Sequence, residues 1–290
     1  MDRNYDLIVI DEASQVGGEM LKDLQMHGLP ILAVGDHGQL PPVMDSGELM
    51  KNPMLRLEKI HRQAAGNPII ALAHHIRTTG TLRSSPDQGS AVRFVEKKNA
   101  QAVILESFCD PTLVSPLDVG MLCWTNRSRV SLNATVRKAL GRSGPPRFGE
   151  PLICLKNKSP VFNGMRGILT ADTIDDSNSV EPWILQARIA FPEESLPEKA
   201  YELCAPQFCR ETVFKSVEEL RERGIRVNTV NEAGALFDFG YAMTVHKAQG
   251  SGFKHAIVYV DRPVQPGNEE WRRWMYTAVT RAAERLTVIV

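Results

Sequence analysis

The stretch YDLIVIDEAS, residues 5–14, decides the fold class of this chain. Its apolar run, Leu7 to Ile10, is short and rich in β-branched residues, which is typical of a strand buried on both faces of a parallel sheet. Asp11 and Glu12 follow the run directly. They lie at the carboxyl end of the expected strand, where open α/β sheets bind their ligands. The stretch therefore predicts an α/β protein with an acidic pair at a ligand-binding edge.

The rest of the chain continues this alternation of strands and helices. Runs that predict strands are residues 31–34, 92–95, 120–126, 256–260 and 286–290. Helical patterns occupy residues 20–26, 69–76, 100–108 and 128–140, and a further helix follows Asn268, a good N-cap residue. Residues 78–90 are polar and rich in turn residues, so they predict a linker. Such alternation is what a parallel sheet requires.

The character of the sequence changes between about residues 148 and 235. Short strand patterns at residues 152–157 and 165–171 flank Asn163-Gly164, a pair that tolerates positive φ and indicates a hairpin. We expect a small all-β insertion here, folded as a barrel.

Composition sets wider limits. The chain has 290 residues, of which 43% are hydrophobic, enough for a sizeable core and roughly two domains. No run of 18 or more apolar residues and no secretory leader pattern occurs, so we expect a cytoplasmic protein. The five cysteines are scattered without Cys-x-x-Cys spacing, which predicts idle thiols rather than a metal site.

Charge is balanced overall, with 34 basic and 34 acidic residues, but it is distributed unevenly. Residues 121–160 carry a single acid, Glu150, against eight basic residues: Arg127, Arg129, Arg137, Lys138, Arg142, Arg147, Lys156 and Lys158. Such a segment is able to follow a phosphate backbone. A solvated helix face and loop explain it equally well.

Several side chains suit phosphoryl transfer. Asp11 can hold Mg²⁺ through water, and Glu12 can take a proton from an attacking water. Gln39, in the loop GDHGQLPPV (35–43), can bind a phosphate oxygen or that water. The guanidinium groups of Arg62 and Arg281 suit the charge on phosphoryl oxygens in the transition state. Taken singly, each of these is an ordinary surface residue.

The last helix carries an apolar stripe as well. We interpret its members as core rather than as a base-stacking surface: Trp271, Trp274, Met275, Ala278 and Ala282.

Seven motifs in series resemble those of superfamily 1 helicases, and most closely the RecD/Dda-type enzymes that move 5′ to 3′ on single-stranded DNA. They are DEAS (11–14), GDHGQLPPV (35–43), LEKIHRQ (57–63), CWTNRSR (123–129), VFNGMRG (161–167), TVHKAQGS (244–251) and MYTAVTRA (275–282). The resemblance implies RecA-like P-loop NTPase motor domains with an inserted small SH3-like β-barrel. By position, an incomplete first motor domain spans residues 1–85, the second spans 86–147 and 236–290, and the barrel spans 148–235.

The resemblance also implies roles for the candidate residues, with ATP and Mg²⁺ as cofactors and single-stranded DNA as partner. Asp11 would hold Mg²⁺, Glu12 would activate water, and Gln39 would sense the γ-phosphate. Arg62 and Arg281 would act as arginine fingers from the two motor domains, and Gly250 would approach phosphate through its backbone. Contacts to DNA and to the cleft would come from Thr125, Asn126, Thr244, His246 and Lys247. Gly252 stands where relatives often carry an acidic residue, so a ribose contact there is not expected.

The sequence contains no Gly-x-x-x-x-Gly-Lys-Ser/Thr loop, which cradles the β and γ phosphates in such enzymes. In the family this loop precedes DEAS. We therefore expect a helicase portion that turns over ATP only when another segment or chain completes the first motor domain. We also expect residues 1–85 to be poorly stable alone, because a two-stranded sheet is marginal in water.

The alternatives are a non-catalytic module that binds single-stranded DNA through its basic segment, and a regulatory remnant that docks on an intact helicase.

Overall fold

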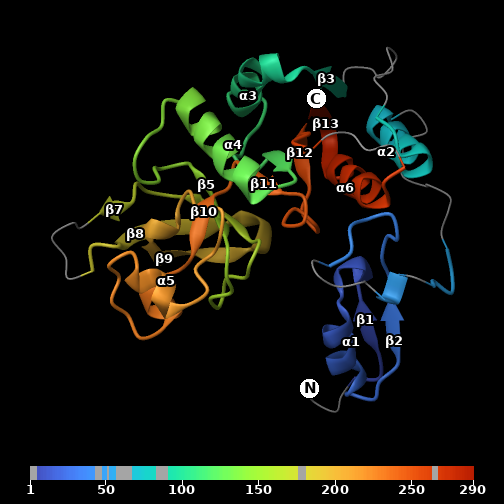
Figure 1. The fold of residues 1–290 in the computed structure, drawn as a ribbon, viewed down its shortest axis with the longest axis horizontal. Coiled ribbons are helices and arrows are strands. Elements are labelled where there is room, and N and C mark those ends of the chain that lie inside the picture. The colour runs from blue at the N-terminus through green and yellow to red at the C-terminus, as the bar shows by residue number, and fades with distance from the viewer. Residues whose placement is uncertain are drawn as a thin grey trace.

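The computed structural model describes residues 5–42, 48–50, 52–56, 67–82, 91–175, 181–262 and 267–290 (Figure 1). Its α-helices are α1 (Gly18–Gln25), α2 (Pro68–Thr79), α3 (Ala100–Phe108), α4 (Asn126–Ala139), α5 (Val217–Arg221) and α6 (Glu269–Val279). The strands before the insertion are β1 (Ile8–Ile10), β2 (Ile31–Ala33), β3 (Val92–Val95) and β4 (Val119–Cys123). The next strands are β5 (Pro151–Cys154), β6 (Arg166–Leu169), β7 (Ile174–Asp175), β8 (Ile184–Phe191), β9 (Leu196–Cys204) and β10 (Phe237–Phe239). The chain ends with β11 (Ala242–Thr244), β12 (Phe253–Tyr259) and β13 (Ala282–Ile289).

A parallel sheet of five strands, in the order β11-β4-β12-β13-β3, forms the centre of the larger part. Consecutive residues of its strands alternate between two apolar layers, as the strand period of two requires. Leu122 of β4 packs in the layer that contains α2 and α6, whereas Met121 packs in the layer that contains α3 and α4. The mixed α/β class with a parallel sheet, predicted from the sequence, is confirmed.

Helix α6 begins as the sequence predicts, because the Asn268 side chain accepts a hydrogen bond from the backbone N–H of Trp271. Its predicted apolar stripe is core, with Trp271 and Trp274 at 2% and 1% exposure. The helix ends at Val279, however, so Ala282 and Arg281 do not belong to it. Ala282 opens β13 instead and is half-buried.

Helix α2 packs beside α6 and against β13 (Figure 1). Its apolar face at Ile69, Leu72 and Ile76 is buried in the same core as Trp274. The sequence had assigned this helix to the first motor domain, but its described contacts lie with the second sheet. A periodic apolar face shows that a helix is buried without showing which sheet it covers.

The insertion forms an antiparallel sheet in the order β10-β5-β6-β8-β7, with β9 also paired to β8. Between β5 and β6, Gly164 has a φ of 95°, as the predicted Asn163-Gly164 turn requires. The last strand, β10, ends at Phe239, so this sheet extends past the boundary expected near residue 235. An SH3-like closure of the sheet, and the domain limits, stay predictions.

Two buried ion pairs fix the insertion to α4. Arg137 contacts Glu150, just before β5, and Arg129 contacts Asp238 of β10. All four side chains are at most 10% exposed. These two arginines of the basic segment are therefore internal structural groups. The hypothesis that all eight basic residues follow a phosphate backbone is wrong for this pair.

The first segment is much smaller (Figure 1). Strands β1 and β2 pair in parallel, and one face of this pair lies on α1 with a core of Ile10, Ala13 and Val16. The other face is open: its large apolar side chains are 47% to 61% exposed, namely Leu7, Val9, Leu32 and Val34. A parallel sheet normally has both faces covered.

Within the described ranges, no helix is both long and apolar enough to span a membrane.

Candidate nucleotide and nucleic-acid site

The acidic pair lies at the carboxyl ends of β1 and β2. The backbone N–H of Ala13 donates to the Val34 carbonyl over 2.9 Å, which holds the two strand ends side by side. Asp11 is exposed, and its Oδ1 accepts a hydrogen bond from the backbone N–H of Glu12. Glu12 has a φ of 49°, a left-handed conformation that costs a non-glycine residue about 1–3 kcal/mol. Such strain is common at functional sites, so it marks Glu12 for attention.

The loop after β2 carries Gln39. Asp36 stabilises this loop by accepting hydrogen bonds from the backbone N–H groups of Gly38 and Gln39, through its carboxylate and its carbonyl respectively. Gln39 is only 7% exposed, and its Oε1 has no hydrogen-bond partner among the described residues. Because buried polar atoms are nearly always paired, an acceptor left open in this way fits a site for a donor from outside the chain, such as a water molecule.

Arg281 lies in the turn between α6 and β13, at 8% exposure. Its guanidinium donates to the carbonyls of Thr277 and Ser251 over 3.2 and 3.3 Å. Burial lowers the pKa of Arg281, and the negative charge of Glu12 offsets part of that effect. The structure thus brings the Glu12 carboxylate within electrostatic range of a buried arginine that is far away in the sequence.

The structure does not define the position of two candidate residues relative to Arg281. Arg62 lies outside the described residues. Asp11 points into solvent at the same strand end, and its approach to Arg281 stays a prediction.

Among the described residues, three hydrogen bonds join the loop after β2 to the second sheet's helix and loops. The Tyr276 hydroxyl donates to Asp36 Oδ2 over 2.6 Å, and the Leu40 N–H donates to Thr277 Oγ1 over 3.0 Å. The Gln249 amide donates to the Leu40 carbonyl over 2.8 Å. Burial and the bond to Asp36 raise the pKa of Tyr276 above its usual value.

Sequence reasoning did not single out these three contact residues. The available signal was their position inside the motifs TVHKAQGS and MYTAVTRA, next to residues that it did select.

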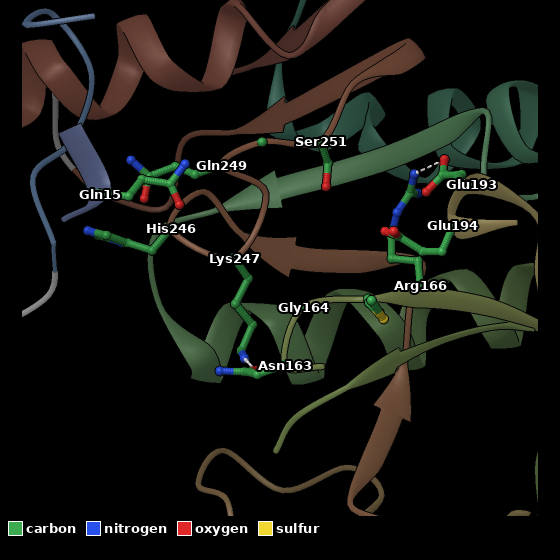
Figure 2. Close-up of a pocket in the computed structure, with 12 residues that line it drawn as sticks. Gln15, Asn163, Gly164, Arg166, Glu193, Glu194, His246, Lys247, Gln249 and Ser251 are labelled. Carbon is green, nitrogen blue, oxygen red and sulfur yellow. Dashed lines mark hydrogen bonds and ion pairs between the residues drawn. The ribbon is translucent and has the colours of Figure 1, made fainter. Parts of the chain in front are cut away.

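The loop after β11 lines a cavity of about 450 Å³ (Figure 2). His246, Lys247 and Gly250 come from this loop, and Gln15 reaches the cavity from the first segment. The cavity is also lined by residues of the insertion, namely Asn163, Gly164, Met165, Arg166, Glu193 and Glu194. The cavity therefore lies where the first segment, the second sheet and the insertion meet.

The charges at this cavity are partly engaged. The Lys247 ammonium donates to Asn163 Oδ1 over 2.5 Å, and burial lowers the pKa of Lys247 (Figure 2). Burial also lowers the pKa of His246, which Glu270 partly opposes. Gly250 has a φ of 78° and open space where a Cβ would stand, so its backbone is accessible.

The remaining candidates for DNA contact lie elsewhere. Thr125 is the N-cap of α4, where its hydroxyl accepts from the Ser128 N–H and donates to Asp261. Asn126 is exposed and accepts a hydrogen bond from Arg129. Thr244 is 8% exposed at the end of β11. The structure does not bring these three to the cavity that His246 and Lys247 line.

The donor set is compatible with Mg²⁺ bound together with a nucleotide. No cluster of three or more metal-ligating side chains occurs in the described ranges, so an all-protein metal cage is not formed there. Mg²⁺ usually binds through one or two carboxylates together with phosphates and water. The exposed Asp11 carboxylate and the open acceptor of Gln39 fit that mode.

Two family models match the sequence. The model described as a UvrD-like helicase C-terminal domain matches residues 239–289, and an AAA domain model matches residues 1–100.

One curated relative matches along nearly the whole chain. It is the ATP-dependent RecD2 DNA helicase of Deinococcus radiodurans, at 27% identity over 97% of this chain and 36% of the relative. The chain thus spans about a third of that protein's length.

Solved structures share the fold. The Pif1 helicase of Candida albicans aligns with a TM-score of 0.57 and 18% identity over 99% of this chain and 72% of that one. The Pif1 helicase of Bacteroides in complex with ADP-AlF3 and ssDNA aligns with a TM-score of 0.55 and 18% identity over 99% and 71%. The chain is thus similar in sequence to UvrD-like and RecD2 helicases, and it shares its fold with Pif1 helicases.

Proposed function

We propose that this chain is part of an ATP-dependent motor that couples hydrolysis to 5′ to 3′ movement on single-stranded DNA. The observation that carries the proposal is that hydrogen bonds hold the loop with Gln39 against α6, the helix that precedes the buried Arg281, on which the negative charge of Glu12 also acts. A buried arginine near an acidic strand end suits a transition state whose charge spreads over phosphoryl oxygens.

The proposed hydrolytic roles follow from position and chemistry. Glu12 takes a proton from the attacking water, and Gln39 offers its open Oε1 to that water. Arg281 stabilises the charge that develops on the γ-phosphate, and Arg62 does so from the first segment. Asp11 holds Mg²⁺, which neutralises phosphate charge when it is bound with ATP.

In this proposal, the phosphate cradle comes from residues other than these 290, either on the same polypeptide or on another one. The open face of β1 and β2 supports such a partner, because Leu7, Val9 and Leu32 are about half exposed or more. A strand and helix that complete the first motor domain would bury these side chains. A cytoplasmic location also stays a prediction.

The proposed DNA contacts centre on the cavity of Figure 2. Lys247 and His246 present donors there, and Gly250 offers accessible backbone. Thr125, Asn126 and Thr244 are proposed as further contacts to DNA or to the cleft.

A purely DNA-binding module is the other candidate. Its main support was the basic segment, and the burial of Arg129 and Arg137 in ion pairs removes part of that support. We therefore favour the motor.

The test is ATP hydrolysis by a fusion that joins the strand, phosphate loop and helix of the RecD2 relative ahead of residue 1. Phosphate release stimulated by oligo(dT) is expected. A folded fusion that binds oligo(dT) but releases no phosphate would contradict the motor and would favour the DNA-binding module.

A further inference from the structure

Both backbone polar groups of Leu40 form hydrogen bonds with the region around the second sheet, one with α6 and one with the loop after β11. Its N–H donates to Thr277 Oγ1, and its carbonyl accepts from Gln249 Nε2. Leu40 is 1% exposed and Thr277 is fully buried, so water does not replace these partners readily. The position of the Leu40 backbone therefore depends on α6 and on the loop after β11, as well as on the bonds that Asp36 makes within its own loop.

Gln39 directly precedes this peptide. Its side chain is buried, and its Oε1 is unpartnered in the described part of the chain. Because Oε1 forms no hydrogen bond there, the position of this oxygen depends on the backbone that carries Gln39.

Gln249 connects the cavity to the backbone of Leu40. With Lys247 it lines the cavity (Figure 2), as does Gly250. Its amide also donates a hydrogen bond to the Leu40 carbonyl. Two residues later, the Ser251 carbonyl accepts a hydrogen bond from Arg281. One short loop therefore contacts the cavity, the peptide next to Gln39, and Arg281.

We infer that Gln249 is a positioning residue that places Gln39 according to the state of the cavity loop. The inference rests on the proposed function in that the cavity is taken to receive single-stranded DNA. When a strand engages Lys247, the loop shifts, the Gln249 amide shifts with it, and the Leu40 carbonyl follows. Gln39 then moves relative to the nucleotide without any contact of its own with DNA.

Hydrogen–deuterium exchange of the whole chain tests this, because the Leu40 N–H is itself one of the bonded groups. Gln249→Met keeps the length of the side chain and removes its donor. Exchange at residues 36–40 should become about fivefold faster, the ratio expected for the loss of one neutral hydrogen bond. Gln186→Met, at an exposed position of β8, is the matched control and should leave exchange at residues 36–40 unchanged.

The second arm adds oligo(dT) of about 12 nucleotides, within the site sizes usual for single-strand binders. In the wild type and in Gln186→Met, oligo(dT) should change exchange at residues 36–40. In Gln249→Met that response should vanish even at oligo(dT) concentrations that saturate the variant, as measured by fluorescence anisotropy. A merely structural role would instead accelerate exchange throughout the chain and lower the urea midpoint.

The outcomes separate the proposed binding of DNA from the positioning role of Gln249. If oligo(dT) does not bind the wild type, the proposed DNA role fails, and the DNA-free comparison still decides whether Gln249 positions residues 36–40. If oligo(dT) binds and exchange at residues 36–40 is the same in wild type and Gln249→Met, the positioning role is overturned.

Discussion

The Tyr276 hydroxyl donates a hydrogen bond to the Asp36 carboxylate over 2.6 Å, across 240 residues of sequence. This bond attaches the loop that carries Gln39 to the helix that precedes Arg281. In the part of the chain that the structure describes, it is one of three hydrogen bonds that hold the small first segment on the second sheet. The following predictions depend on this attachment and on the groups around it.

Tyr276→Phe removes this bond and keeps the ring. A hydrogen bond to a charged group contributes about 1.5 kcal/mol or more, so the undocked state should become about tenfold more populated. Proteolytic cleavage within residues 5–42, which reports that population, should accelerate by the same factor. Tyr259→Phe, on β12 of the same sheet, should cleave like the wild type. Equal cleavage of both variants would show that the bond does not hold the segment.

Limited proteolysis of the wild type should yield a resistant fragment that begins shortly before Pro68. The sequence analysis expects residues 1–85 to be poorly stable, but α2 packs on α6 and so lies with the more stable part. The first segment buries little: its core consists of Ile10, Ala13 and Val16, and the opposite sheet face is open. A resistant fragment that starts near residue 1 would contradict this ordering of stabilities.

Arg137→Met should destabilise the chain by about 3 kcal/mol, because it leaves the fully buried Glu150 carboxylate without its cation. Urea denaturation measures this loss. The matched control is Arg188→Met, which breaks an exposed pair with Glu198 and should cost about 0.5 kcal/mol or less. A similar small loss for both variants would mean that the Arg137 pair does not fix the insertion.

His255 should make stability depend on pH. It is 6% exposed, and burial, followed by the nearby charge of Arg285, lowers its pKa from 6.5 to about 4. Between these values the unfolded chain binds a proton that the folded chain does not, so stability should fall as pH falls from about 6.5 to about 4. The full effect is on the order of 3 kcal/mol at 1.36 kcal/mol per pKa unit.

Urea midpoints at several pH values check this. His255→Gln, which keeps a polar group toward Thr287, should flatten the dependence in that window. An unchanged slope in this variant would assign the pH dependence to other groups.

Lys247→Ala should weaken binding to oligo(dT) and reduce the slope of log affinity against log salt by about 0.7, the value for one lost contact to single-stranded phosphate. Lys199→Ala, on exposed β9, is the control and should leave the slope unchanged. A slope that both variants leave intact would remove Lys247 from the DNA contacts.

The sequence predicted most elements of the fold because their signals are local. The apolar run before Asp11 became β1, the helix expected over residues 100–108 is α3, and the Asn268 cap begins α6. Each rests on periodicity, capping or turn chemistry within a few residues. Long-range pairing has no such signal, so the packing of α2 on α6 was not predicted.

For the site as well, residues with a local chemical signal were predicted and long-range contacts were not. Glu12, Gln39 and Arg281 were selected from residue chemistry and motif order, and the structure places Glu12 near Arg281. The residues that attach one part to the other, such as Tyr276 and Gln249, were not selected. Their partners, Asp36 and Leu40, lie more than 200 positions away. No local pattern in the sequence indicates the ion pair between Arg129 and Asp238, so the basic segment at residues 121–160 was interpreted as exposed.

The central claim is that Arg281 completes a pocket for the γ-phosphate. It is tested most directly by single-turnover hydrolysis of ATP in the fusion that carries the phosphate loop. Arg281→Lys keeps the charge and removes the planar donor fork, and the rate should fall by about 10³-fold. Arg285→Lys, at a partly buried ion pair with Asp110, should keep the wild-type rate. Equal rates for Arg281→Lys and wild type, in fusions that bind ATP and oligo(dT) normally, would contradict the claim.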